Sequence, residues 1–103
     1  MQTAVNNKAT LLQCLSSHRQ QIKSFGVKEL GLFGSFVRNT ANTNSDIDLL
    51  VEFEPDKKSY DNFMELAFYL EDLLGRNVEL VTSQSLSKYI GPHILKEVEN
   101  VSL

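Results

Sequence analysis

The sequence predicts an α/β fold, in which a small mixed β-sheet carries its helices on one face. The predicted elements follow in the order helix, strand, strand, helix, strand, which is typical of a helical layer on a sheet. Both long helical segments carry one apolar stripe, so each has one side to bury. In the segment 46–53, apolar residues alternate with mainly acidic ones, as in a half-buried strand. The second face of the sheet is left open for a ligand.

The first predicted helix spans residues 10–25 and ends before Gly26. Its apolar residues recur at helical spacing. They are Leu11, Leu15, Ile22 and Phe25. His18 falls on the same stripe, and Cys14 belongs to the same helix. We interpret both as partly buried structural residues, because a histidine at a helix margin more often packs than acts as a base or ligand.

The first predicted strand, residues 27–33, stops at Gly34-Ser35, and Arg38 follows one turn later. A glycine allows the sharp turn that brings consecutive backbone N–H groups close to an anion. Such donors at the start of a short helix bind phosphate, and a hydroxyl and a guanidinium group add further donors. We therefore predict that Gly34, Ser35 and Arg38 bind the phosphates of a nucleotide.

The second predicted strand, residues 46–53, places Asp46 and Asp48 on one face together with Leu50 and Glu52. Same-face neighbours on a strand lie about 6.5–7 Å apart at their Cα atoms. Two carboxylates at this distance repel each other and can converge on one or two cations. Because Mg²⁺ prefers oxygen ligands and keeps positions open for substrate phosphates, we expect magnesium, with two ions, at this site.

The next predicted helix starts at Ser59 or Asp61, either of which can cap it, and Gly75 closes it. Its apolar residues form one stripe. They are Phe63, Leu66, Ala67, Leu70 and Leu74. A third strand follows over residues 77–82, and it holds one acid, Glu79, in its middle.

The C-terminal part is predicted to form two short helices over residues 85–89 and 92–99, the second starting at Pro92. Some of its apolar residues are expected to pack on the sheet and some to remain for a second protein. Three basic residues here could reach a nucleotide phosphate, but we interpret them as solvated surface charges. They are Lys88, His93 and Lys96.

Composition limits the classes of function. A chain of 103 residues with 42% apolar and 22% charged residues is expected to form a single domain over residues 1–103. A net charge of −3 without a run of Lys or Arg argues against direct binding of nucleic acid. The sequence lacks a signal-peptide pattern and a membrane span, and it has one cysteine, so we expect a cytoplasmic protein without a membrane partner.

The spacing of the central motif carries a family resemblance. Gly34-Ser35, ten intervening residues and then Asp46-Ile47-Asp48 resemble the nucleotidyltransferase motif of the DNA polymerase β-like superfamily, and most of all its minimal nucleotidyltransferase branch. That family has a third acid on a later strand, where Glu79 stands here. The resemblance implies the polymerase β-like palm fold. It also implies that Asp46, Asp48 and Glu79 are catalytic residues and metal ligands.

The parts suggest the transfer of a nucleoside monophosphate. The acids and the phosphate turn would hold a nucleoside triphosphate with its α-phosphorus facing an acceptor hydroxyl, and Glu79 could take the proton of that hydroxyl. The resemblance adds the acceptor. Minimal nucleotidyltransferases of this size are typically antitoxins that form a module with an all-helical HEPN ribonuclease toxin, and some transfer AMP from ATP to a toxin tyrosine. It therefore implies a protein adenylyltransferase in a hetero-oligomer with its toxin.

Three alternatives compete with this interpretation. The chain could be a stoichiometric antitoxin that binds and masks its toxin without catalysis; the complete set of acids favours the enzyme. An EF-hand calcium loop, counted from Asn42 or Asn44, would place an apolar residue where that loop requires glycine. Asp46 and Asp48 could also be plain solvent-facing residues of an edge strand. The upstream phosphate turn argues against that last interpretation.

Overall fold

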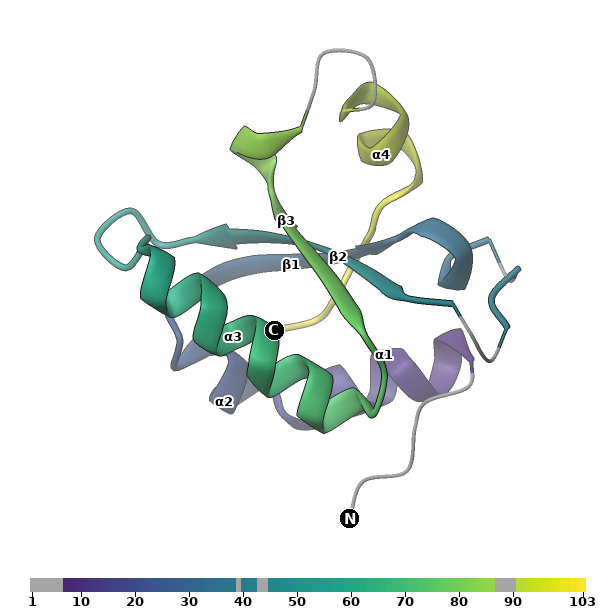
Figure 1. The fold of residues 1–103 in the computed structure, drawn as a ribbon, viewed down its shortest axis with the longest axis horizontal. Coiled ribbons are helices and arrows are strands. Elements are labelled where there is room, and N and C mark those ends of the chain that lie inside the picture. The colour runs from purple at the N-terminus through teal and green to yellow at the C-terminus, as the bar shows by residue number, and fades with distance from the viewer. Residues whose placement is uncertain (1–6, 39, 43–44, 87–90) are drawn as a thin grey trace.

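The structure, a computed structural model, describes residues 7–38, 40–42, 45–86 and 91–103 (Figure 1). Two short 3₁₀ helices, η1 and η2, lie among its α-helices and strands. In order they are α1 (Lys8–Ser17), α2 (Arg19–Lys23), β1 (Val27–Phe33), η1 (Gly34–Phe36), β2 (Ile47–Phe53), α3 (Tyr60–Leu74), β3 (Val78–Thr82), η2 (Ser83–Ser85), α4 (Gly91–Glu97) and β4 (Glu99–Asn100).

The four strands form one mixed sheet in the order β3-β2-β1-β4. Strand β1 runs antiparallel to both β2 and β4, whereas β2 and β3 run parallel. Helices α1, α2 and α3 lie on one side of this sheet, and α4 lies on the other (Figure 1). The predicted fold class, an α/β fold with a small mixed sheet, is confirmed, and the longer helices pack on one face as predicted, whereas the short α4 lies on the face that was expected to be open.

The period-two pattern of β2 separates the core from the open face of the sheet. Ile47, Leu49 and Val51 are fully buried under the helices, whereas Asp48 and Leu50 are only half-buried on the other face. The neighbouring strands and helices add large apolar side chains to the same core. They include Leu11, Leu15, Ile22, Leu30, Leu32, Phe36, Leu66, Leu70 and Leu74. The buried layer therefore holds β2 in one register, because a slip by one residue would expose every core side chain.

Helix α3 has clear start and stop signals. The hydroxyl oxygen of Ser59 accepts a hydrogen bond from the backbone N–H of Asn62 at 3.1 Å, so Ser59 and not Asp61 caps the helix. Gly75 ends the helix in the left-handed conformation. This end leads directly into β3 and so determines where Glu79 lies along the sheet.

The first predicted helix is wrong in one respect, because two helices, α1 and α2, replace a single helix over residues 10–25. The break is at His18, whose backbone leaves the helical region with φ −111° and ψ 21°. Its Nδ1 donates a hydrogen bond to the carbonyl oxygen of Cys14 at 2.9 Å. The half-buried imidazole thus donates a hydrogen bond to a carbonyl group in the last turn of α1. This contact caps the helix and favours its end at this point.

The C-terminal prediction needs a larger correction. Of the predicted helix over residues 85–89, Ser85 belongs to η2 (Ser83–Ser85) and Leu86 is extended, so the helix does not begin at these two residues. Residues 87–90, with Lys88, lie outside the described residues. Helix α4 stops at Glu97, and the next residues form β4 instead of more helix. The backbone N–H of Val101 donates to the carbonyl oxygen of Leu30 at 2.8 Å. Pairing with the free edge of β1 and burial of Val101 outweigh another helical turn.

The turn into β4 depends on a close approach to the sheet. A Cβ atom at Gly31, in the middle of β1, would lie 2.5 Å from a methyl group of Val98. Because Gly31 lacks that atom, the residue after α4 can lie directly on the open face. In the described part of the chain, no helix is long and apolar enough to cross a membrane.

Candidate functional site

The candidate site lies where the end of β1 meets the start of β2 and β3. In the sheet register, Asp48 stands beside Glu79 of β3 on one side and beside Phe33 of β1 on the other. Neighbouring residues of adjacent strands point to the same face, so both acids face away from the helical core. The next residue after Phe33 is Gly34, which begins the turn that was predicted to bind phosphate. The sheet thus brings the acids and the turn together.

The Gly34 turn requires a glycine for two reasons. Its φ is +81°, in the left-handed region that other residues adopt only with strain. A Cβ atom built on Gly34 would also overlap the carboxylate of Asp48. The turn and Asp48 are therefore packed against each other, and the 3₁₀ helix η1 starts directly at this contact.

A cavity of about 520 Å³ opens beside this contact. Four of the six predicted site residues line it, and they are Gly34, Arg38, Asp48 and Glu79. The rest of its lining comes from the end of β1, from β3 and from the C-terminal part, including His93 and Glu97. The cavity therefore combines backbone and guanidinium donors with carboxylates, which is the chemistry needed for an anion together with a cation.

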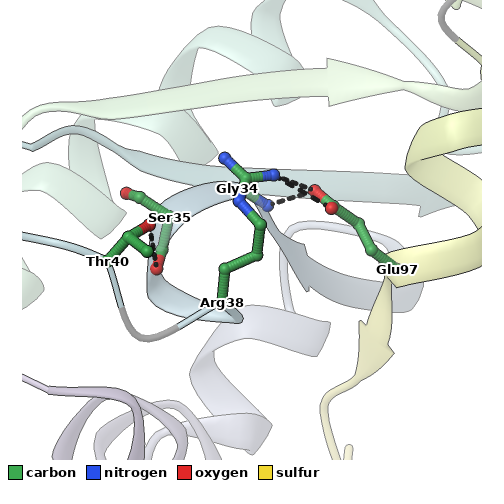
Figure 2. Close-up of polar contacts among 5 residues, drawn as sticks. All are labelled: Gly34, Ser35, Arg38, Thr40 and Glu97. Carbon is green, nitrogen blue, oxygen red and sulfur yellow. Dashed lines mark hydrogen bonds and ion pairs between the residues drawn. The ribbon is translucent and has the colours of Figure 1, made fainter.

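The other two predicted residues, Ser35 and Asp46, do not line this cavity. Ser35 is half-buried in η1, and its carbonyl oxygen accepts a hydrogen bond from the backbone N–H of Thr40 at 2.9 Å. Figure 2 shows a second contact between these residues, in which the Thr40 hydroxyl donates to the same carbonyl oxygen at 3.4 Å, on the far side of Gly34 from Glu97. Asp46 is exposed just before β2 begins. Its charge still acts on Asp48, as the ionisation of that residue shows.

The pKa of Asp48 is raised to about 6. The largest cause is burial, which disfavours the charged form, followed by repulsion from Glu79 and then from Asp46. A hydrogen bond between protonated Asp48 and Glu79 raises the pKa further, and Arg38 partly opposes these effects. The positive charge of Arg38 therefore does not balance the negative charges around Asp48.

The donor set fits a hard divalent cation. Among the described residues, no group of three or more His, Cys, Asp or Glu side chains is arranged to hold a metal ion. The close pair is Asp48 and Glu79, and Asp46 adds negative charge from the segment before β2. Oxygen donors that repel one another are stabilised by a cation such as Mg²⁺. The residues present therefore suit the predicted metal, although the three acids do not form a closed cluster.

Glu97 is a site residue that the sequence analysis did not identify. Its Oε1 accepts hydrogen bonds from the backbone N–H of Gly34 at 2.9 Å and from Nη1 of Arg38 at 3.0 Å. Its Oε2 lies 2.9 Å from the same Nη1. Figure 2 shows Glu97 reaching from α4 to both partners. The Gly34 hydrogen bond is the largest cause that lowers the pKa of Glu97, and Arg38 adds to it. No local pattern marks this glutamate, because its role depends on where α4 lies.

Arg76, between α3 and β3, was also missed. Its Nη2 donates to the carbonyl oxygens of Asn42 at 2.5 Å and of Ser45 at 2.6 Å, and its Nε donates to Ser45 as well at 3.2 Å. Its guanidinium carbon lies 5.1 Å from the ring centre of Phe36 in η1. Arg76 therefore joins the two ends of the motif, η1 and the segment that leads to Asp46. A short sequence window cannot reveal this role, because its partners lie more than 30 residues earlier in the chain.

Comparisons with known proteins agree on one family. Residues 15–101 match the family described as nucleotidyltransferase domain. The chain is 46% identical to the protein adenylyltransferase MntA of Thermococcus cleftensis over 85 residues, which are 82% of this chain and 85% of that protein. Among solved structures, it resembles a minimal nucleotidyltransferase with a TM-score of 0.81 and 28% identity, covering 94% of this chain and 98% of the other. It also resembles a chain of a toxin-antitoxin structure with AMP-PNP, with a TM-score of 0.67 and 27% identity, covering 93% and 73%.

Asp48 should make stability depend on pH in metal-free protein. Its folded pKa, about 6, exceeds the ordinary value of 3.8, so between these pH values the folded state binds more protons than the unfolded state. Stability should therefore fall as the pH rises through this range. The substitution Asp48→Asn should remove this decline and give a melting temperature at pH 8 equal to or above that of the wild type. Thermal unfolding in a chelating buffer from pH 4 to pH 8 measures this. Asp72→Asn, at an exposed position on α3, is the control and should keep the decline.

Arg76 should stabilise the motif through the shape of its side chain and not through charge alone. The substitution Arg76→Lys keeps the charge but loses the planar fork that bonds two carbonyl oxygens, so the free energy of unfolding should fall by about 1–2 kcal/mol. Denaturant unfolding measures this difference. Arg19→Lys is the control, because Arg19 makes one long contact of 3.4 Å to Ser16. Equal stability of the two variants would contradict the role assigned to Arg76.

Proposed function

This chain belongs to the nucleotidyltransferase domain family, and from that premise we propose that it is an antitoxin that transfers AMP from ATP to its cognate toxin. The predicted enzyme class, nucleotidyltransferase, is confirmed by the same family match. The observation that supports the proposal most strongly is the shared cavity, where the Gly34 turn and Arg38 face the acids Asp48 and Glu79. The finer assignment of the acceptor to a tyrosine of a HEPN ribonuclease toxin follows the resemblance of the central motif.

The proposed roles divide between binding and transfer. The Gly34 N–H group and the Arg38 guanidinium bind triphosphate oxygens, since both donors face the cavity and can bond an anion. Ser35 does not line the cavity, so its proposed role as a hydroxyl donor from η1 rests on the motif alone. Asp46, Asp48 and Glu79 would hold Mg²⁺, with two ions expected, and bound Mg²⁺ would neutralise charge on the triphosphate and on the leaving pyrophosphate.

The proposed reaction is an in-line displacement at the α-phosphorus of ATP. A bond forms between the acceptor oxygen and the α-phosphorus, and the bond from that phosphorus to the oxygen bridging to the β-phosphate breaks. Pyrophosphate leaves near Arg38, whose positive charge stabilises it. Glu79 takes the proton of the acceptor hydroxyl, which its exposed position on β3 allows. The products are an AMP ester of the toxin and pyrophosphate.

The relatives support both the nucleotide and the partner. The Thermococcus cleftensis relative is a protein adenylyltransferase, and one similar structure is a toxin-antitoxin structure with AMP-PNP. A toxin as acceptor fits the open side of the cavity, which a hydroxyl on a second protein can reach. The competing function, masking without catalysis, would need only a binding surface. Masking alone gives no reason for Asp48 to be held beside Glu79, where repulsion between the two carboxylates raises the pKa of Asp48.

Nucleotide binding should depend on magnesium. Without a cation, the triphosphate and the acids Asp46, Asp48 and Glu79 repel one another, so chelation of metal should weaken ATP binding by at least about tenfold. Isothermal titration calorimetry with ATP, in excess Mg²⁺ and in EDTA, measures the difference. A protein that binds ATP equally tightly in EDTA would contradict the proposed metal-bridged site.

Catalysis should depend on Glu79, whereas masking should not. Glu79→Gln keeps the size of the side chain but removes the proton acceptor, so AMP transfer to the toxin should fall by about 10² or more, while toxin binding persists. The measurement is the mass gain of the toxin with substoichiometric antitoxin, ATP and Mg²⁺, alongside recovery from toxin activity. Asp48→Asn should also be inactive. Glu52→Gln, on the same face of β2 but away from the cavity, should behave like the wild type.

Neutralisation that requires equimolar antitoxin and is equal for all these variants would support masking and contradict transfer. Tandem mass spectrometry of the modified toxin would identify the residue that carries AMP. A modified side chain other than tyrosine would correct the acceptor but keep the reaction.

A further inference from the structure

The anion-binding donors of the site are already satisfied by a side chain of the protein itself. Glu97 Oε1 takes the N–H of Gly34, and both oxygens of Glu97 lie within 3.0 Å of Nη1 of Arg38. A carboxylate and a phosphate present similar oxygens and the same sign of charge to such donors. Glu97 therefore stands where a phosphate group of the nucleotide would bind if the proposed function holds.

We propose that Glu97 is an internal competitor that sets the affinity for the triphosphate and restricts the Gly34 turn to strongly anionic ligands. The inference rests on the proposed function, because it concerns the same turn. The Gly34 N–H group can donate one good hydrogen bond, so the phosphate and Glu97 exclude each other there. Their negative charges also repel each other. Nucleotide binding therefore requires that the carboxylate of Glu97 leave both donors.

The position of Glu97 is built into the fold and is not that of a loose surface side chain. Glu97 is the last residue of α4, and the next residue, Val98, packs where Gly31 leaves room on the sheet. Strand β4 then pairs with β1, and Val101 is buried in the core. The C-terminal segment is thus fixed on one side of Glu97, and the carboxylate is delivered to the turn from a defined direction. About a quarter of the side chain, 27%, remains exposed, so the contact can open without unfolding the core.

The alternative is that Glu97 orients Arg38 for the phosphate, and the two roles predict opposite signs. A positioning residue helps nucleotide binding, so its loss weakens affinity. A competitor occupies the donors in the free protein, so only the fraction of molecules with free donors can bind nucleotide. Removal of the competitor should therefore strengthen the affinity by the inverse of that fraction. Because the carboxylate takes the Gly34 N–H group as well as Arg38, the contacts favour the competitor.

The test is the affinity for ATP with Mg²⁺, and for inorganic tripolyphosphate, measured by calorimetry on the full chain. Glu97→Ala should bind both about threefold to tenfold more tightly than the wild type, the range expected for removal of one charge-assisted contact. Glu97→Gln, of nearly the same shape, should give a smaller gain because it keeps an oxygen for the Gly34 N–H group. Circular dichroism establishes that each variant is folded.

The matched control is Glu99→Gln, two residues later in the chain. Glu99 pairs with Lys8 of α1 at 2.7 Å and does not line the cavity, so this change removes the same charge without freeing the turn. Its affinity for ATP should equal that of the wild type. The gain from Glu97→Ala should also shrink when Arg38→Ala is present, because the two residues share one contact.

The outcomes separate this inference from the proposed function. If the wild type binds ATP and Glu97→Ala binds it equally or more weakly, the competitor role is overturned and the proposed function stands. An equal gain for Glu99→Gln would attribute the effect to net charge and would also overturn it. If neither the wild type nor Glu97→Ala binds ATP or tripolyphosphate, the proposed function fails, and the competitor role fails with it.

Discussion

The structure depends on one crowded contact, the carboxylate of Asp48 held between the Gly34 turn and Glu79. It requires that β2 pair with β1 and β3 in one register, because only then do the turn and both acids meet. It also requires a residue without Cβ at position 34. Every second residue of β2 is buried in the core, and this burial fixes the register. Packing on one face of the sheet therefore forces the carboxylates together on the other face.

Groups of the protein itself partly balance the charges of the site. The pKa of Asp48, raised to about 6, lets this residue keep a proton at more acidic pH, where the proton balances charge in place of a cation. Glu97 supplies a carboxylate to the Gly34 N–H group and to Arg38, the donors that the proposed function assigns to phosphate. The proton and the carboxylate thus resemble, in charge, the metal and the phosphate of the proposed substrate complex. In the proposed complex, Mg²⁺ would replace the proton of Asp48 and a phosphate would replace the carboxylate of Glu97. The affinity for the nucleotide would therefore reflect this exchange.

The positions of the elements show how far local patterns reach. Both interior strands, the Ser59 cap and the end of α3 at Gly75 follow from short-range signals, and the structure confirms them. The break at His18 and the strand β4 were not predicted. The break at His18 involves a local contact, since the imidazole bonds back to Cys14, whereas β4 needs a distant partner, the edge of β1. Two residues of strand carry too little pattern to be distinguished from a helix end.

The sequence by itself determined the fold class, the family and the residue types of the candidate site, because each rests on periodicity or on spacing within one short stretch. Gly34, Arg38 and Asp48 belong to that stretch, and Glu79 follows from the pattern of a single strand. Only the tertiary structure decided that Glu97 occupies the turn and that Arg76 joins the two ends of the motif. The physical reason is range: these contacts join residues about 30 to 60 positions apart, and packing of the whole chain brings them together.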